Sequence, residues 1–246
     1  MNIKKHISGE DILAEVIHTD YKILSVLKRF GIHLGFGDAG ISDICKNYGI
    51  NENFFLEIIN IYLDKSYFPA KKMQSFSIRL ITDFLKSSHY YYNVDKIPSI
   101  KSKIEQLEWK GPEHERNFSI LMQFFNQYKN EVKTHTDQEE EKVYPYAIFI
   151  EESCVQNKNI ETCLNRMKEY SITDYAKEHD DIEEKLTDLK NIIIKYLPAP
   201  KDQSILHEIL NDLFLLENDL NNHGRIEEKI LVPKILEMEE HLKSKK

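Results

Sequence analysis

Residues that interrupt helices are concentrated at one end of this 246-residue sequence. Six of the 8 glycines lie within the first 49 residues, and the first of the 7 prolines is Pro69. Because glycine and proline are the main interrupters of helices, their scarcity after this point predicts long helices. The change in composition also predicts two units, a small helical domain over residues 1–68 and a larger unit over residues 69–246.

The first unit has the apolar spacing of short helices. Apolar residues recur at helical intervals over residues 12–17 and 23–30, and a glycine-rich loop over residues 31–40 follows. A short helix is expected over residues 41–48. Asn51 is a suitable N-cap for the next helix, because its side-chain oxygen can accept a hydrogen bond from an N–H group that the first helical turn leaves free.

The second unit has the apolar periodicity of four long helices. We expect them over about residues 75–93 (with a continuation after Pro98), 112–151, 160–196 and 203–243. The third allows an interruption around residues 171–174, and its IIIKY segment suits a strand by composition but continues a helical pattern. Four long helices with short links predict an all-α fold, an up-down-up-down four-helix bundle preceded by the small helical domain.

Composition argues against several classes of protein. There are 33 basic and 41 acidic residues, whereas nucleic-acid binders usually carry a basic face. Mean hydropathy is -0.50, and no apolar run approaches the ~18–20 residues of a membrane helix. The sequence begins without the pattern of a secretory signal, and its three scattered cysteines do not form a disulfide framework. We therefore expect a cytoplasmic protein with neither a nucleic-acid nor a membrane partner.

One pattern, H-x3-E-E-x4-P, occurs twice in the second unit. The first motif runs from His135 to Pro145, and the second motif runs from His223 to Pro233. A histidine and a glutamate four residues apart share one face of a helix. Imidazole nitrogen and carboxylate oxygen together suit iron, manganese or zinc, so the two motifs predict a metal site.

A single H-x3-E pattern is weak evidence, because it also occurs at His6/Glu10 and His179/Glu183. An isolated pair of this kind more often lies on a solvated helix face. The two motifs share more than this pair, since both also have the second acid and the proline at the same offsets. The other two predicted helices each add a histidine, His89 and His179, so that all four helices contribute to one candidate site.

The second unit resembles the hemerythrin-like domain in the form found in the repair-of-iron-centres (RIC) family of di-iron proteins. Those proteins are four-helix bundles whose successive helices supply a His, an H-x3-E pair, a His and a second H-x3-E pair to a non-haem site. The resemblance implies six ligands: His89, His135, Glu139, His179, His223 and Glu227. It also implies two Fe ions that the two glutamates bridge, with an oxo bridge when the irons are oxidised. His114 has a different spacing from the family's additional histidine and is left out of this set.

Other polar groups lie near the implied ligands in the sequence. The acids next to them, Glu140, Asp180 and Glu228, are candidates to orient the imidazoles through hydrogen bonds. One tyrosine of the run Tyr90–Tyr92 could lie near the metals as a hydrogen-bond donor or redox-active phenol, although packing between helices is the simpler interpretation.

The resemblance extends to the first unit with one important difference. RIC proteins carry a Cys-Cys-Gly sequence there, after an aromatic-Gly-Ile string that this chain keeps at Phe30–Ile32. Gly35 and Phe36 stand where the cysteine pair would be, and Cys45 does not replace a pair. Any thiol chemistry of that loop is therefore not expected in this chain.

Three functions remain open at this point. The first is a stress protein that binds or processes O2, NO or peroxide, or that manages iron for damaged iron–sulfur proteins. The second is a sensor whose first unit reports ligand binding to a partner. The third is an interaction protein with a vestigial or zinc-occupied site. No catalytic acid or base is apparent, so enzymatic activity stays open. The first unit can cover its own bundle or a neighbour's, and the second case would give a homodimer.

Overall fold

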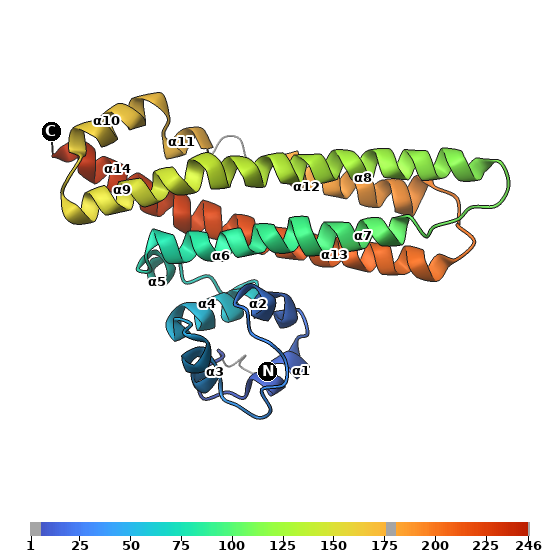
Figure 1. The fold of residues 1–246 in the computed structure, drawn as a ribbon, viewed down its shortest axis with the longest axis horizontal. Helices are drawn as coiled ribbons and strands as arrows, with labels where there is room; N and C mark the ends of the chain where they lie inside the picture. Colours follow the sequence, from blue (N-terminus) through green and yellow to red (C-terminus); the bar gives the residue numbers. More distant parts are fainter. Residues whose placement is uncertain (1–5, 176–180, 246) are drawn as a thin grey trace. The chain divides into compact units, whose positions relative to one another are not determined.

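The computed structural model describes residues 6–175 and 181–245. The regular secondary structure of these residues is helical with no β-strand, and an isolated bridge between Ile12 and Gly40 is the one strand-like pairing among them. The chain divides into two compact units, Met1–Ser87 and Ser88–Lys246, with the division inside helix α6 (Figure 1). The domain boundary that the composition predicted after residue 68 stays a prediction. In the described part of the chain, no helix is long and apolar enough to cross a membrane.

The first unit is a set of short helices around an aromatic core. Its helices are α1 (Leu13–Thr19), α2 (Ile23–Arg29), α3 (Ile41–Tyr48), α4 (Glu52–Leu63) and α5 (Ala70–Gln74), followed by the start of α6 (Ile78–Tyr90). Asn51 caps α4 as predicted, since its side chain accepts a hydrogen bond of 3.0 Å from the backbone N–H of Phe54. Phe30 packs against Phe55 and Phe84 with ring centroids 4.9 and 5.3 Å apart.

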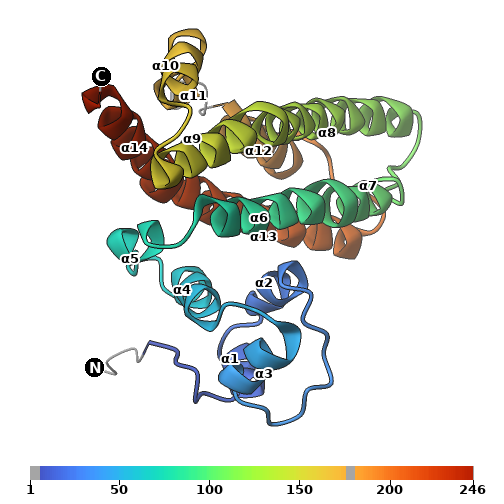
Figure 2. The same ribbon diagram turned by 60° about the vertical axis from the view of Figure 1, so that its left-hand side comes forward.

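Within the described residues, the second unit consists of four helical rods that each contain a π-helical turn, and this turn interrupts three of the rods and ends the third. The first rod is the end of α6, η1 (Tyr91–Lys96) and α7 (Ile97–Ile104); the second is α8 (Glu113–Gln138), η2 (Glu139–Val143) and α9 (Tyr144–Gln156); the third is α12 (Asp181–Asn191) and η3 (Ile192–Tyr196); the fourth is α13 (Gln203–Ile226), η4 (Glu227–Leu231) and α14 (Val232–Ser244). Figures 1 and 2 show these rods running up and down in alternation.

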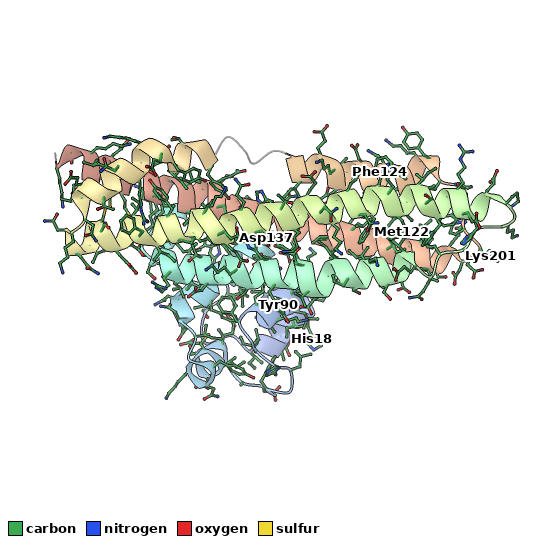
Figure 3. The ribbon with its side chains drawn as sticks, turned by 45° about the horizontal axis from the view of Figure 1, so that its top comes forward. His18, Tyr90, Met122, Phe124, Asp137 and Lys201 are labelled. Atoms are coloured by element: carbon green, nitrogen blue, oxygen red, sulfur yellow. The ribbon has the colours of Figure 1, made fainter. Side chains whose placement is uncertain are left out.

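Contacts between neighbouring rods establish a four-helix bundle. Helix α7 packs on α8 and α13, and α12 packs on the same two helices from the other side. Helix α9 packs on α14. The core of one half of the bundle is apolar and includes Phe125, Tyr128, Leu189 and Leu213, all of them buried. Phe124, the neighbour of Phe125, is by contrast 36% exposed on α8 (Figure 3). The all-α bundle predicted from the sequence is confirmed.

The connection between the second and third rods differs from the single helix expected from residue 160. The segment forms α10 (Ile160–Glu169) and the short α11 (Ile172–Tyr175), with Tyr170 in extended conformation between them. Helix α10 packs on α9 and α14, and α11 packs on α14 (Figure 2). The break therefore lies near the predicted interruption, and it brings α11 against the fourth rod.

All four π-helical turns end two residues before a proline. The prolines are Pro98, Pro145, Pro198 and Pro233. In each case, the residue before the proline donates its N–H to the carbonyl five residues back rather than four. A proline inside a helix clashes with the carbonyl four residues back and lacks an N–H, and the widened turn relieves both problems where the helix continues, at Pro98, Pro145 and Pro233. The third rod instead ends before Pro198, because Leu197 is extended. Two of these turns begin at Glu139 and Glu227, which explains the fixed glutamate-to-proline spacing in the two motifs.

Candidate metal centre

Four buried side chains from three rods meet inside the bundle. His89 comes from the end of α6, Glu139 opens η2, His223 lies in the last turn of α13, and Glu227 opens η4. Each offers a nitrogen or oxygen atom, and these atoms all lie within 4.8 Å of one another. None of the four residues is more than 5% exposed. We call this group the four-residue cluster.

The cluster is centred on the Nε2 atom of His89. This atom lies 3.1 Å from Oε2 of Glu139 and 3.2 Å from Nε2 of His223. The Nε2 atom of His223 lies in turn 3.3 Å from Oε1 of Glu227. Two imidazole nitrogens and two carboxylate oxygens thus converge on one small volume, which is an arrangement that suits a cation.

Glu140 fixes the tautomer of His89. Its Oε1 atom lies 2.9 Å from Nδ1 of His89. Because an ionised carboxylate only accepts hydrogen bonds, Nδ1 must carry the proton, and in the neutral ring Nε2 then directs its lone pair into the cluster. A carboxylate behind a metal-binding histidine is a common way to orient the ring. This is the role expected from the sequence for Glu140. Asp180 lies outside the described residues.

The remaining predicted ligands are placed differently. His135 lies next to the cluster rather than within it, with its Nε2 atom 2.9 Å from Oε1 of Glu139 and its side chain 22% exposed. His179 lies outside the described residues. The structure therefore brings together four of the six predicted residues and sets a fifth, His135, against one of their carboxylates.

Hydrogen bonds set the charges in the cluster. Burial opposes ionisation of Glu139, but hydrogen bonds from His135 and His89 hold its pKa well below the usual range. Burial lowers the pKa of His89, yet its hydrogen bonds to Glu139 and Glu140 outweigh this effect and raise the pKa to about 9. The same balance raises the pKa of His135, where the partner is Glu139. Protons on the histidines therefore balance buried carboxylate charge when no metal ion does so.

The donor set fits a transition metal. Buried carboxylates require a neighbouring cation, because an uncompensated buried charge is strongly unfavourable. The Nε2 atoms of His89 and His223 face each other directly, so two neutral rings can place only one proton between them. Nδ1 of His223 has no hydrogen-bond partner among the described residues. A cation bound by nitrogen and oxygen donors resolves this crowding, and such mixed sites suit iron, manganese or zinc.

Two tyrosines that the sequence analysis did not single out donate hydrogen bonds to the cluster. The hydroxyl of Tyr144 donates to Oε1 of Glu227 at 2.7 Å, and the hydroxyl of Tyr175 donates to Oε1 of Glu139 at 2.5 Å. Burial, together with the charges of the two glutamates, raises the pKa of both phenols well above its usual value, so both remain donors. The sequence does distinguish Tyr144, because it lies inside the first motif at a position where the second motif has Val232. Tyr175 lies outside both motifs, and no sequence pattern distinguishes it.

The tyrosine run after His89 contributes one neighbour. Tyr92 is buried, with its ring edge against His223 at a centroid distance of 5.7 Å, and its hydroxyl donates to Asp219 at 2.8 Å. Tyr90 is 62% exposed and lies on the bundle surface (Figure 3). The histidine left out of the ligand set, His114, instead accepts a hydrogen bond of 3.2 Å from the backbone N–H of Trp109.

A small cavity adjoins the cluster. It has a volume of about 60 Å³, and its walls include His135, His223 and Glu227 on the polar side. Val132 and Leu220 are among its apolar walls. Since a cavity of about 10–15 Å³ in this measure already holds one water molecule, the space suits a small ligand of a few heavy atoms. Glu228 lies at this cavity and Glu140 does not, so the second acids of the two motifs have different positions.

Comparison with known families gives one match. Residues 99–235 of the 246-residue chain match the family model described as the hemerythrin HHE cation binding domain. The matched range spans more than half of the chain and contains both motifs, whereas His89 precedes it. No protein in the curated set matches the chain.

Proposed function

The chain belongs to the hemerythrin HHE cation-binding domain family, and from this premise we propose that it is a non-haem di-iron protein that binds or processes O2, NO or peroxide. The observation that supports this proposal is the four-residue cluster, in which two histidines and two glutamates from three rods lie buried within 4.8 Å of one another. A buried pair of carboxylates needs compensating positive charge, which a metal ion held between these donors would supply.

Six residues of this chain would hold the metal. These would be His89, His135, Glu139, His179, His223 and Glu227, of which the two glutamates would supply the carboxylates of the site. When bound, the two irons would supply a redox-active pair that can take up a small oxygen- or nitrogen-containing ligand. Glu140 would keep His89 in the tautomer that presents Nε2, and the tyrosine hydroxyls would hold the glutamates in fixed orientations.

The cavity supports a small ligand rather than an organic substrate. About 60 Å³ leaves room for O2, NO or peroxide beside the cluster, and the walls include the apolar side chains of Val132 and Leu220. Within this function, we place the protein in the response to oxidative or nitrosative stress. Because Gly35 and Phe36 replace the cysteine pair of the RIC family, a role in iron–sulfur repair would have to proceed without thiols of that loop.

The function is tested with the reduced, iron-loaded protein. The protein is reconstituted anaerobically with ferrous iron and then exposed separately to NO, O2 and hydrogen peroxide, with optical spectra recorded over time. We expect at least one of these to change the spectrum within seconds and in proportion to the iron content. If an iron-loaded protein is inert to all three, the ligand-processing role is wrong and a role as an interaction protein takes its place.

A further inference from the structure

A buried carboxylate outside the cluster anchors the short helix α11. Glu239 of α14 is 1% exposed, and its Oε1 atom accepts hydrogen bonds from the backbone N–H of Ile172 at 3.1 Å and from the hydroxyl of Tyr146 at 2.6 Å. Its other oxygen lies 3.7 Å from Nζ of Lys243. A buried carboxylate is tolerated only with such partners, so Glu239 ties the first residue of α11 to the fourth rod and to α9.

Helix α11 carries the hydroxyl that reaches the cluster. It comprises only four residues, from Ile172 to Tyr175, and both of these end residues are buried. A single helical turn has little stability of its own, so its position depends on the contacts at its ends. Glu239 holds one end, and at the other end Tyr175 donates to Glu139.

Tyr175 donates its hydrogen bond to Glu139, whose carboxylate also contacts two histidines. Oε1 of Glu139 is the atom that also faces His135 at 2.9 Å, while Oε2 faces His89 at 3.1 Å. A donor on Oε1 restricts the rotation of this carboxylate and draws electron density from it. The other cluster glutamate, Glu227, receives its own donor from Tyr144, so each carboxylate is held by one phenol.

We propose that Glu239 is a positioning residue of the metal centre, which acts through α11 by holding the Tyr175 hydroxyl on the Glu139 carboxylate. The connection between the second and third rods then contributes to the site, because it holds the Tyr175 hydroxyl in place. This inference rests on the proposed metal function, and it adds a path from Glu239 to a ligand that it does not touch. Loss of a partner that orients a metal ligand typically weakens metal binding by about 10–100-fold.

The test compares the iron-release rates of four variants of the full chain. Each is loaded with ferrous iron, and release to an excess of chelator is followed together with the visible spectrum of the oxidised form. We expect Tyr175→Phe to release iron about tenfold faster and to shift the spectrum. Glu239→Gln should do the same, and the double variant should release iron no faster than the faster single variant. Tyr128→Phe is the matched control, because Tyr128 is a fully buried tyrosine whose hydroxyl has no partner among the described residues.

Each outcome has a definite meaning. If Tyr175→Phe releases iron at the wild-type rate, the inference is wrong although the di-iron proposal stands. If the effects of the two single changes multiply in the double variant, Glu239 does not act through Tyr175. If the wild-type protein takes up no iron, the proposed function itself fails. Should Glu239→Gln not fold, Tyr146→Phe removes one donor to Glu239 and is expected to accelerate release by a smaller factor.

Discussion

The first motif, His135–Pro145, and the second motif, His223–Pro233, place their glutamates at the same point of their rods but in different surroundings. Both glutamates open a π-helical turn and are buried. The His135 side chain is 22% exposed, whereas the His223 side chain is buried and part of the four-residue cluster. The shared pattern thus determines the backbone shape, and the packing around each motif determines how its histidine is used.

The two motifs also differ in the hydrogen bonds that each donates to the other. Tyr144 of the first motif donates to Glu227 of the second, whereas Val232 at the same offset cannot return a hydrogen bond. Glu139 instead receives its donor from Tyr175, outside either motif. The symmetry of the sequence is therefore broken at the level of hydrogen bonds, and variants can test which of these differences matters.

The largest effect is expected from removing one motif at a time. His135→Ala with Glu139→Ala, and separately His223→Ala with Glu227→Ala, should each abolish iron binding, because the two motifs share one site. The iron-dependent increase in thermal stability should disappear in both, since metal binding contributes to folding free energy. Metal content and melting temperature are measured with and without iron. Retention of two irons per chain by either double variant would contradict the ligand assignment.

Removal of the asymmetric donor should have the next largest effect. Tyr144→Phe keeps the ring and deletes the hydroxyl that donates to Glu227, so iron affinity should fall by about tenfold. Competition with a chelator of known affinity measures this change. Val232→Ala serves as the matched control in the second motif and should leave the affinity within about twofold. Equal losses in the two variants would show that the hydroxyl has no specific role.

The second acids of the motifs, Glu140 and Glu228, should differ in their effect on how stability depends on pH. Hydrogen bonds to Glu139 and Glu140 outweigh burial and raise the pKa of His89 to about 9, from an unfolded value near 6.5. Protonated His89 therefore stabilises the metal-free protein fully below about pH 6.5, and this stabilisation is lost as the pH rises through about 9. Melting temperatures of the metal-free protein should fall over this window, whereas iron affinity should rise because the bound ligand is neutral.

Glu140→Gln and Glu228→Gln sharpen this prediction. Glu140 contacts His89 and Glu228 lines the cavity, so only Glu140→Gln should flatten the fall in melting temperature. The two are compared by thermal unfolding between about pH 6 and pH 9.5. An unchanged pH profile in Glu140→Gln would mean that this carboxylate does not hold the proton on His89.

The smallest effects are expected one residue after each motif histidine. Gly224→Ala should stabilise the protein by about 0.5–1 kcal/mol, because alanine is the better helix former and its methyl group meets open space. Thr136→Ala should destabilise it by about 1 kcal/mol, since Thr136 accepts a hydrogen bond from Asn93 and donates one to Lys133. Chemical denaturation of the metal-free proteins gives both values. If both substitutions changed the free energy of unfolding in the same direction, the expected difference between the two positions would be wrong.

The sequence was most informative where periodicity or repetition carried the signal. The scarcity of glycine and proline predicted the long rods, Asn51 predicted the start of α4, and the repeated motif predicted three of the four members of the cluster. His89 has no motif of its own: it was singled out because it lies on the first predicted helix of the bundle, and the family resemblance then implied that it is a ligand. These features are local or repeated, which is why a single sequence reveals them.

What the sequence did not reveal depends on contacts between distant segments. The prolines marked both motifs, but the π-helical turns that they induce were not predicted. Helix α11, which carries Tyr175, begins with a hydrogen bond from Ile172 to Glu239, which lies 64 residues further along the chain than Tyr175. A hydrogen bond between such distant segments produces no periodic pattern in the sequence. The partial exposure of His135 could not be predicted either, because it depends on how the rods pack.

Metal content is the most direct test of the central claim, which is that the two motifs hold a di-iron site. The protein is purified in air, analysed for its elements and examined by optical spectroscopy. We predict about two iron ions per chain and a near-ultraviolet absorption that bleaches on reduction, as expected for an oxo-bridged pair. Zinc alone, or no metal after anaerobic reconstitution with ferrous iron, would contradict the account.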